Sequence, residues 1–333
     1  MPEYFRPITS TDSFRPDNAY TLAGGWAWFT HAERMTRQGS AGLVSAEDLP
    51  SEVLERLTSP RIPIAGLTFD RPKIMGILNV TPDSFSDGGN FSSAASGVTH
   101  AREMIGAGAD ILDIGGESTR PGAKEVELDE EIRRTEPVIR AIRSESAIPI
   151  SIDTRKAPVG KAALDAGANL INDVAAFSFD PELATVAAQN RAPVCLMHAQ
   201  GSPEDMQKDP NYDDVLLDVF DYLQSRIEFA ESLGISRDRI VVDPGIGFGK
   251  TQDHNLRLLK SISTFHGLGC PILLGASRKR FIGTIGNAPI ADKRAPGSMA
   301  VALAGVSQGV QILRVHDVSD TAQALALHMA VNG

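Results

Sequence analysis

From about residue 73 onward, short apolar runs alternate with longer stretches in which apolar residues recur every three or four positions. The short runs suit buried strands, and the longer stretches have the period of amphipathic helices. The predicted strands cover 74–78, 111–114, 148–152, 170–171, 193–197, 240–242, 271–274 and 311–315. The predicted helices include 94–107, 129–143, 157–166, 213–233, 254–261 and 297–308. Eight strands that alternate with helices over about 260 residues predict an α/β fold, a (β/α)8 TIM barrel.

An open, doubly wound sheet is the alternative fold with the same alternation. Such a sheet usually has fewer strands and a glycine fingerprint after its first strand. The segment after the first predicted strand reads NVTPDSFSDGG and has no such fingerprint. Segments 107–110 and 166–169 also repeat one pattern, in which glycine ends a helix shortly before an apolar run. The repeat supports successive β/α units.

Residues 1–67 have a different pattern from the rest of the chain. They contain both tryptophans, few strand signals and one short helix candidate around 53–57, with Ser45 as its candidate N-cap. A segment of this length with so few elements is marginal as an independent fold. We therefore expect 1–67 to be an N-terminal extension, packed on the barrel or used in a subunit contact, and 68–333 to form the barrel.

Composition narrows the classes of partner. The chain has 333 residues, and 32 basic minus 42 acidic residues give a net charge of −10. This charge argues against general attraction to nucleic acid or to an acidic membrane, so any anion must bind in a local positive pocket.

The two cysteines, Cys195 and Cys270, lie in or beside apolar runs, which predicts buried thiols without a disulfide or a metal site. The N-terminus has no signal-peptide pattern, and its longest apolar stretch, 22–29, is too short to span a bilayer. The expected location is a reducing cytoplasm.

Polar residues follow every predicted strand, and catalytic residues of TIM barrels lie at these strand ends. The strand ends carry Asn79, 115–122 (GGESTRPG), 153–156 (DTRK), 172–173 (ND), 197–198 (MH), 243–250 (DPGIGFGK), 277–280 (SRKR) and 314–317 (RVHD). Each of these alone could be a helix cap or a surface ion pair. Eight polar ends in register predict a ligand site at one mouth of the barrel.

The residue types at this mouth indicate the kind of ligand. Asp153, Asn172 and Asp243 offer acceptors that suit a planar, nitrogen-rich ring, and Lys279 and Arg314 could stack on such a ring. On other loops, Asn79, Arg120 and His316 could gather an anion. A Gly-Lys-Thr triplet at 249–251 has the end of a P-loop pattern, but Pro244 stands where that pattern needs glycine.

The strand-end motifs resemble those of the dihydropteroate synthases, a family of pterin-binding barrel enzymes. The matching segments are ILNVTPDSFSDGG, DIGGESTRPGA, SIDTRK, IND, LMH, VDPGIGFGKT, GASRKRFIG and RVHD. They occur in family order from about residue 68 to the end, so the extension receives no role. The bulky sequence 175–177 (AAF) also departs from the family pattern and leaves the packing of its loop open.

The resemblance implies a role for each matching residue. The implied pterin-binding residues are Asp153, Asn172, Met197, Asp243, Phe248, Lys279 and Arg314. Asn79 is the implied Mg²⁺ ligand and contacts the diphosphate together with Arg120 and His316. Phe85, Thr119, Pro121 and Ser277 are implied around the aminobenzoate, and the loops 81–93 and 118–127 are implied to order over the reacting groups. Asp153, Arg120, Lys279 and His316 are the implied catalytic residues.

The implied reaction joins 6-hydroxymethyl-7,8-dihydropterin diphosphate to p-aminobenzoate with loss of diphosphate, in folate biosynthesis. We expect an SN1-like path, Mg²⁺ as cofactor, a homodimer and a sulfonamide target. A pterin-binding methyltransferase should lack the two long loop motifs, and a non-catalytic pterin-binding paralogue should lack residues such as Asn79, Thr119 or Arg120. The chain shows no Schiff-base lysine context and no paired acid–base spacing, which argues against a generic isomerase or aldolase barrel.

Overall fold

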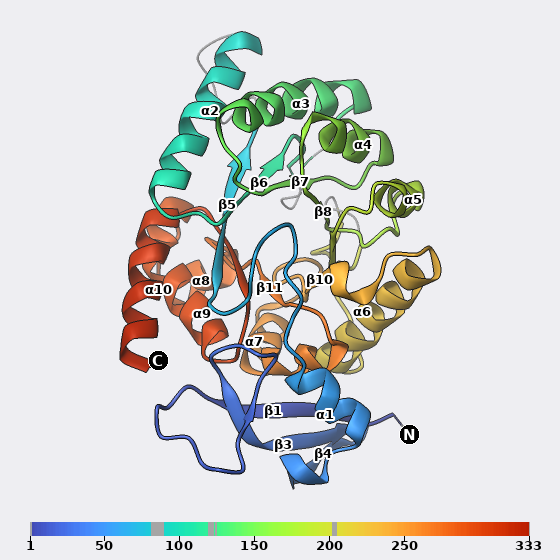
Figure 1. The fold of residues 1–333 in the computed structure, drawn as a ribbon, viewed down its shortest axis with the longest axis vertical. Coiled ribbons are helices and arrows are strands. Elements are labelled where there is room, and N and C mark those ends of the chain that lie inside the picture. Colours follow the sequence, from blue (N-terminus) through green and yellow to red (C-terminus); the bar gives the residue numbers. More distant parts are fainter. Residues whose placement is uncertain (1, 81–89, 119–122, 124, 202–204, 333) are drawn as a thin grey trace.

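The computed structural model describes residues 2–80, 90–118, 123, 125–201 and 205–332. Two parts follow each other along the chain, a small antiparallel sheet and a barrel (Figure 1). No helix in the described ranges has both the length and the apolar composition needed to cross a bilayer.

Among the described residues, one parallel sheet contains eight strands in the order β10-β9-β8-β7-β6-β5-β12-β11. The strands are β5 (Lys73–Asn79), β6 (Ile111–Gly115), β7 (Ile150–Asp153), β8 (Leu170–Asp173), β9 (Val194–Met197), β10 (Ile240–Asp243), β11 (Leu273–Leu274) and β12 (Ile312–Val315). A parallel bridge between Val242 and Ile272 joins the two ends of this order. The predicted TIM barrel is therefore confirmed, and the open-sheet alternative is wrong.

Helices surround the barrel; those from α2 to α9 lie between successive strands, and α10 follows β12 (Figure 1). They are α2 (Asn90–Gly106), α3 (Leu128–Glu145), α4 (Ala157–Ala166), α5 (Glu182–Gln189), α6 (Val215–Ser232), α7 (Gln252–Lys260), α8 (Arg280–Ile285), α9 (Ala295–Val306) and α10 (Val318–Asn332). The end of α4 shows how the sequence sets a boundary. Gly167 follows it with a φ of 112°, a left-handed conformation that glycine adopts without steric cost.

The extension contains more strands than its sequence suggested. It forms β1 (Tyr4–Ser10), β2 (Tyr20–Thr21), β3 (Trp28–Thr36) and β4 (Gly39–Ser45), followed by α1 (Ser51–Thr58). The expectation of few strands was wrong because the register shifts twice, near Pro7 and near Glu33. Such bulges interrupt the alternation of buried and exposed positions by which strands are recognised. Ser45 does not cap α1, which begins after Pro50.

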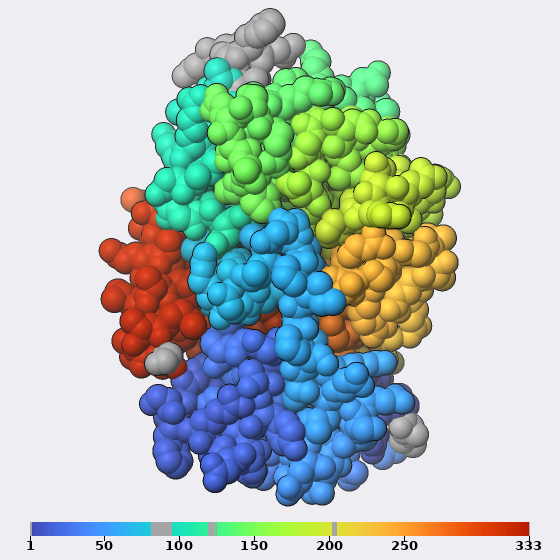
Figure 2. All heavy atoms as spheres, viewed as in Figure 1, coloured from blue at the N-terminus to red at the C-terminus, as the bar shows by residue number. Residues whose placement is uncertain are grey.

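The extension packs on the end of the barrel at which the strands begin. Trp26 Nε1 donates to the Val306 carbonyl at 2.9 Å, and the Tyr4 hydroxyl donates to Asp221 of α6 at 2.8 Å. The buried Arg61 donates to the His266 carbonyl at 3.0 Å. Figure 2 shows the extension as the blue mass at one end of the molecule.

The segment after α1 closes this end of the barrel from inside. Ile64, Leu67 and Phe69 form one buried cluster with residues at the amino ends of the strands, including Ile111 and Leu170. Cys195 belongs to the same cluster, and both cysteines are buried and free, as predicted. Among the described residues, apolar side chains fill this end of the barrel, so the carboxyl ends of the strands are the side open to a ligand.

Candidate active site

A cavity of about 1070 Å³ lies over the carboxyl ends of the barrel strands. Its lining includes seven of the predicted site residues: Asn79, Asp153, Phe248, Ser277, Lys279, Arg314 and His316. Asn172, Met197 and Asp243 are buried at the ends of β8, β9 and β10, next to this lining. Phe85, Thr119, Arg120 and Pro121 lie outside the described residues.

Arg314 is the centre of a charged group at the floor of the cavity. Its Nε donates to Asp113 Oδ2 and its terminal nitrogen to Asp153 Oδ2, both at 2.6 Å. Asn172 donates to the same oxygen of Asp113 at 3.2 Å. Arg314 is thus held by two carboxylates, and its guanidinium is fixed in the floor of the cavity.

Asp113 is a site residue that the sequence analysis missed. It was counted as part of the apolar run 111–114, although an aspartate within such a run is itself a signal. Its side chain is completely buried, and its Oδ1 has no hydrogen-bond partner in the described part of the chain. A buried, unpaired acceptor is costly, so this atom suits a ligand that brings an N–H donor into the cavity.

Burial dominates the electrostatics of the carboxylates. It raises the pKa of Asp153 to about 7; Arg314 opposes this effect and the charge of Asp113 adds to it. Burial also raises the pKa of Asp243, against the effect of Lys279, while the carboxylate accepts a 2.7 Å hydrogen bond from the Gly245 N–H. A change of solvent access or a bound ligand can therefore alter the charge of Asp153 near neutral pH.

Lys279 forms part of the cavity wall beside these acids. Its ammonium lies 4.2 Å from the ring centroid of Phe248 and donates to the Ile246 carbonyl. Burial lowers the pKa of Lys279 to about 7, and Asp243 opposes this effect. Its neighbour Arg278 is held instead by Asp317 and Asp292, each at 2.6 Å. The basic run 278–280 therefore contains a structural arginine next to a lysine of the site.

The glycine-rich loop after β10 is tied to β9. Gly245 has a φ of 67°, and a Cβ at this position would lie 1.8 Å from the His198 carbonyl oxygen. The buried Lys250 donates to the Phe248 carbonyl at 3.0 Å and contacts His198 Nδ1 at 2.8 Å. His198 lies behind the cavity lining, and burial, followed by the charge of Lys250, lowers its pKa well below the ordinary value.

Asp173 holds the conformation of the loop after β8. Its carboxylate accepts hydrogen bonds from the N–H groups of Ala175 and Phe177 at 2.8 and 2.6 Å, and burial raises its pKa to about 6. Phe177 is buried against Phe229 of α6. The bulky sequence 175–177 thus packs among the helices and does not narrow the cavity.

At the rim, Ser277 and His316 are in contact. The Ser277 hydroxyl oxygen lies 3.0 Å from His316 Nδ1 and accepts the His316 backbone N–H at 3.2 Å. Asn79 ends β5 on the same face of the barrel. The cavity therefore combines buried acceptors at its floor with an amide, an imidazole and cations around its wall.

Comparison with known proteins connects this geometry to a family. Residues 75–316 match the family described as "Pterin binding enzyme". The dihydropteroate synthase of Synechocystis sp. is 45% identical over 267 residues, which cover 79% of this chain and 92% of that protein. The chain belongs to the dihydropteroate synthase family. It is accordingly a transferase of folate biosynthesis.

Solved structures of dihydropteroate synthases share the fold. That of Xanthomonas albilineans with 4-aminobenzoic acid is 46% identical, with a TM-score of 0.78, and covers 83% of this chain and 99% of that chain. A structure of the same enzyme in complex with 7,8-dihydropteroate is 43% identical, with a TM-score of 0.75, covering 82% and 99%. The family match lies wholly within the barrel, so the extension is outside it.

Proposed function

We propose that this dihydropteroate synthase joins 6-hydroxymethyl-7,8-dihydropterin diphosphate to p-aminobenzoate in the cavity at the barrel mouth. The observation that carries the proposal is the buried acceptor group of Asp113, Asp153 and Asn172, which holds Arg314 in the floor of the cavity next to Lys279 in its wall. The ligands named in the X. albilineans structures, 4-aminobenzoic acid and 7,8-dihydropteroate, are one substrate and the product of this reaction.

The floor residues are proposed to bind and orient the pterin ring. The carboxylates of Asp113 and Asp153 and the amide of Asn172 accept its N–H groups, while Asp243 and Met197 complete the floor. Lys279 and Phe248 form the adjacent wall, and Arg314 offers a planar face together with N–H donors.

The departure of diphosphate creates positive charge on the pterin, which neighbouring carboxylates stabilise. Asp153 and Asp243 are the buried groups in position to do so. The aniline nitrogen of p-aminobenzoate is neutral near pH 7 and needs no strong base. The proposed path is SN1-like, without a covalent enzyme intermediate, and a labelled enzyme–pterin adduct isolated during turnover would contradict it.

The rim residues suit a Mg²⁺ ion that is shared with the substrate. No cluster of three or more His, Cys, Asp or Glu that could hold a metal exists among the described residues. Mg²⁺ commonly keeps several waters and takes oxygens from substrate phosphates, so one protein oxygen, that of Asn79, is compatible with such a site. When bound there, the ion would neutralise charge on the leaving diphosphate. His316 is proposed to hold the diphosphate oxygens, together with Arg120, for which the sequence predicts the same role.

The test is diphosphate release by the purified protein. The assay contains the pterin diphosphate with and without p-aminobenzoate and Mg²⁺. Release that requires all three, with 7,8-dihydropteroate as co-product, is the expected result. Tight pterin binding without turnover would instead identify a non-catalytic pterin-binding protein. The homodimer and the cytoplasmic location remain predictions for this enzyme.

A further inference from the structure

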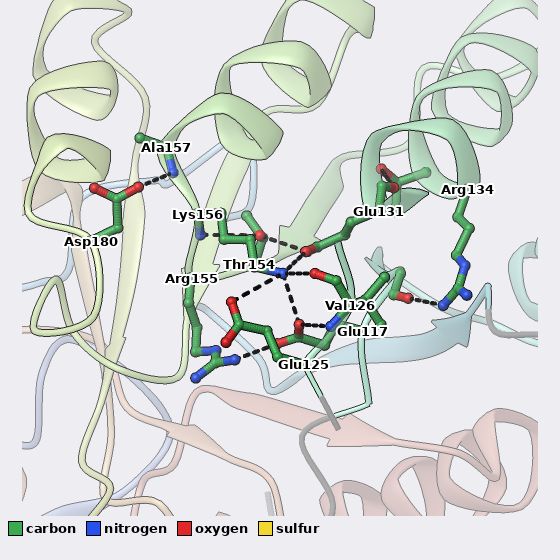
Figure 3. Close-up of polar contacts among 12 residues, drawn as sticks. Glu117, Glu125, Val126, Glu131, Arg134, Thr154, Arg155, Lys156, Ala157 and Asp180 are labelled. Carbon is green, nitrogen blue, oxygen red and sulfur yellow. Dashed lines mark hydrogen bonds and ion pairs between the residues drawn. The ribbon is translucent and has the colours of Figure 1, made fainter. Parts of the chain in front are cut away.

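A buried cluster of charged residues borders the cavity on the β6–β7 side and is not used by the proposed reaction. Glu117, Glu131 and Lys156 are each less than 10% exposed, with values of 7%, 1% and 5%. Figure 3 shows the ammonium of Lys156 at the centre of the cluster, surrounded by oxygens from three separate stretches of chain. Glu117 also lines the cavity, next to Ser118.

The contacts of Lys156 join these stretches. Its ammonium lies 2.8 Å from Glu117 Oε2, which follows β6, and 2.8 Å from Glu131 Oε2 on α3. It also donates to the Val126 carbonyl, while Glu117 Oε2 accepts the Val126 N–H at 2.8 Å. Positions 117 and 126 are thereby held to one side chain and to each other.

Neighbouring residues complete the cluster. Arg155 pairs with the other oxygen of Glu117, and the Thr154 hydroxyl donates to Glu131 at 2.7 Å. Burial lowers the pKa of Lys156, but its contacts with Glu117 and Glu131 outweigh burial and raise it above the ordinary value. Lys156 is therefore charged in the folded protein at neutral pH.

Stability alone is a weak explanation for such a cluster. Buried ion pairs repay little more than the cost of removing their charges from water, and apolar residues of similar volume often stabilise a protein as well. What apolar residues cannot do is hold a backbone N–H, a carbonyl and two carboxylates at fixed distances. The hydrogen bonds of Lys156 hold such groups next to the cavity wall.

We propose that Lys156 is a positioning residue for the reaction of p-aminobenzoate, because it fixes the cavity wall of Glu117 and Ser118. In the sequence this wall directly precedes Thr119 and Pro121, two of the residues predicted around p-aminobenzoate. This inference rests on the proposed function. The pterin acceptors Asp113 and Asn172 lie on β6 and β8, which both pair with β7, and are held by the barrel itself. Loss of Lys156 should therefore affect use of the second substrate far more than pterin binding.

The main variant is the double substitution Lys156→Met with Glu131→Gln. The second change is needed because Glu131 would otherwise remain buried with an unpaired charge, which could unfold the protein or disturb Asp153. Lys156→Arg tests whether another cation rescues the wall. Lys161→Met is the matched control, because Lys161 lies on α4 in an exposed ion pair with Asp165.

Two measurements decide the proposal. Hydrogen exchange of the Val126 amide should become at least about tenfold faster in the double variant, without a matching change in the barrel strands. The kcat/KM for p-aminobenzoate should fall about 10–100-fold, as expected for a misplaced wall of a reactive site, while the Kd for the pterin changes less than about twofold. Lys156→Arg should restore most of the loss, and Lys161→Met should behave like the parent.

The proposal would be overturned if the double variant had the same Val126 exchange rate and the same kcat/KM for p-aminobenzoate as the parent. An equal loss of pterin affinity and of p-aminobenzoate use would also overturn it, because it would indicate general damage to the fold. Should the double variant fail to fold, Glu117→Gln provides the same two measurements, with a smaller expected effect because glutamine still offers one acceptor. If the parent does not turn over, the proposed function fails, while the exchange measurement still decides whether Lys156 holds Val126.

Discussion

Replacing Lys279 with arginine should remove an alkaline loss of pterin binding that we expect in the parent protein. The charged groups near Lys279 include Asp243, Arg314 and Lys250, and its ammonium also contacts Phe248. Burial lowers the pKa of Lys279 from 10.5 to about 7. The side chain therefore loses its positive charge as the pH rises above neutrality, and with the charge it loses its attraction for ring acceptors.

The size of the effect follows from this pKa. Well above pH 7, each further pH unit reduces the charged fraction about tenfold, which corresponds to about 1.4 kcal/mol of binding free energy if only the ammonium binds. This is an upper limit, because Lys279 is partly exposed to the cavity and water screens its charge. Asp153, whose pKa is also about 7, acts in the opposite direction because its carboxylate forms as the pH rises. Parental affinity should therefore be greatest near pH 7.

The assay is calorimetric titration with 6-hydroxymethyl-7,8-dihydropterin from about pH 6 to 9, for the parent, Lys279→Arg and Lys279→Met. Arginine stays charged throughout this range, so its affinity should not fall on the alkaline side. Methionine should bind more weakly at pH 7 and show no alkaline fall. Titration of the ligand itself is common to all three proteins. Equal alkaline falls in the parent and in Lys279→Arg would refute the assignment of this limb to Lys279.

Three further predictions concern the floor, the closed end of the barrel and the rim. Asp153→Asn should weaken pterin binding about 10–100-fold in the same titration, because a buried charged acceptor is lost; the exposed Asp165→Asn is its control, and an unchanged Kd would exclude Asp153 from the floor. Leu67→Ala should lower the free energy of unfolding in urea by about 2–5 kcal/mol, since Leu67 is 6% exposed within the apolar cluster; a loss below about 1 kcal/mol would mean that this end of the barrel is not closed by packing. Arg120→Ala should cost about 2–4 kcal/mol in kcat/KM, and chelation of Mg²⁺ should stop diphosphate release without weakening pterin binding; turnover that survives either change would contradict the proposed rim.

Local patterns in the sequence determined most of the barrel. The helix predicted at 157–166 has those bounds in the structure, because proline near its start and glycine after its end act within a few residues. The eight strand regions were also recognised, since short apolar runs suit strands that are buried on both faces. Polar residues directly after these runs predicted a site at the strand ends, because the carboxyl ends of parallel barrel strands meet at one mouth.

Where the alternation of apolar and polar positions was interrupted, the sequence did not predict the structure correctly. The bulges in β1 and β3 hid the antiparallel sheet of the extension, and Asp113 was hidden within an apolar run. In both cases the residue's environment is set by pairing with another strand. Such pairing is not encoded in the immediate sequence neighbours.

The partners within the site were decided by the closure of the barrel. Arg314 lies 201 residues from Asp113 and 161 from Asp153 along the chain, yet β12 pairs with β5 and brings its arginine over both carboxylates. The contacts of Lys156 with Glu117 and Glu131 likewise join β7 to the preceding β/α unit. The sequence by itself determined which polar groups stand at the strand ends. Only the tertiary structure decided which of them are paired, which are buried, and therefore which are charged near neutral pH.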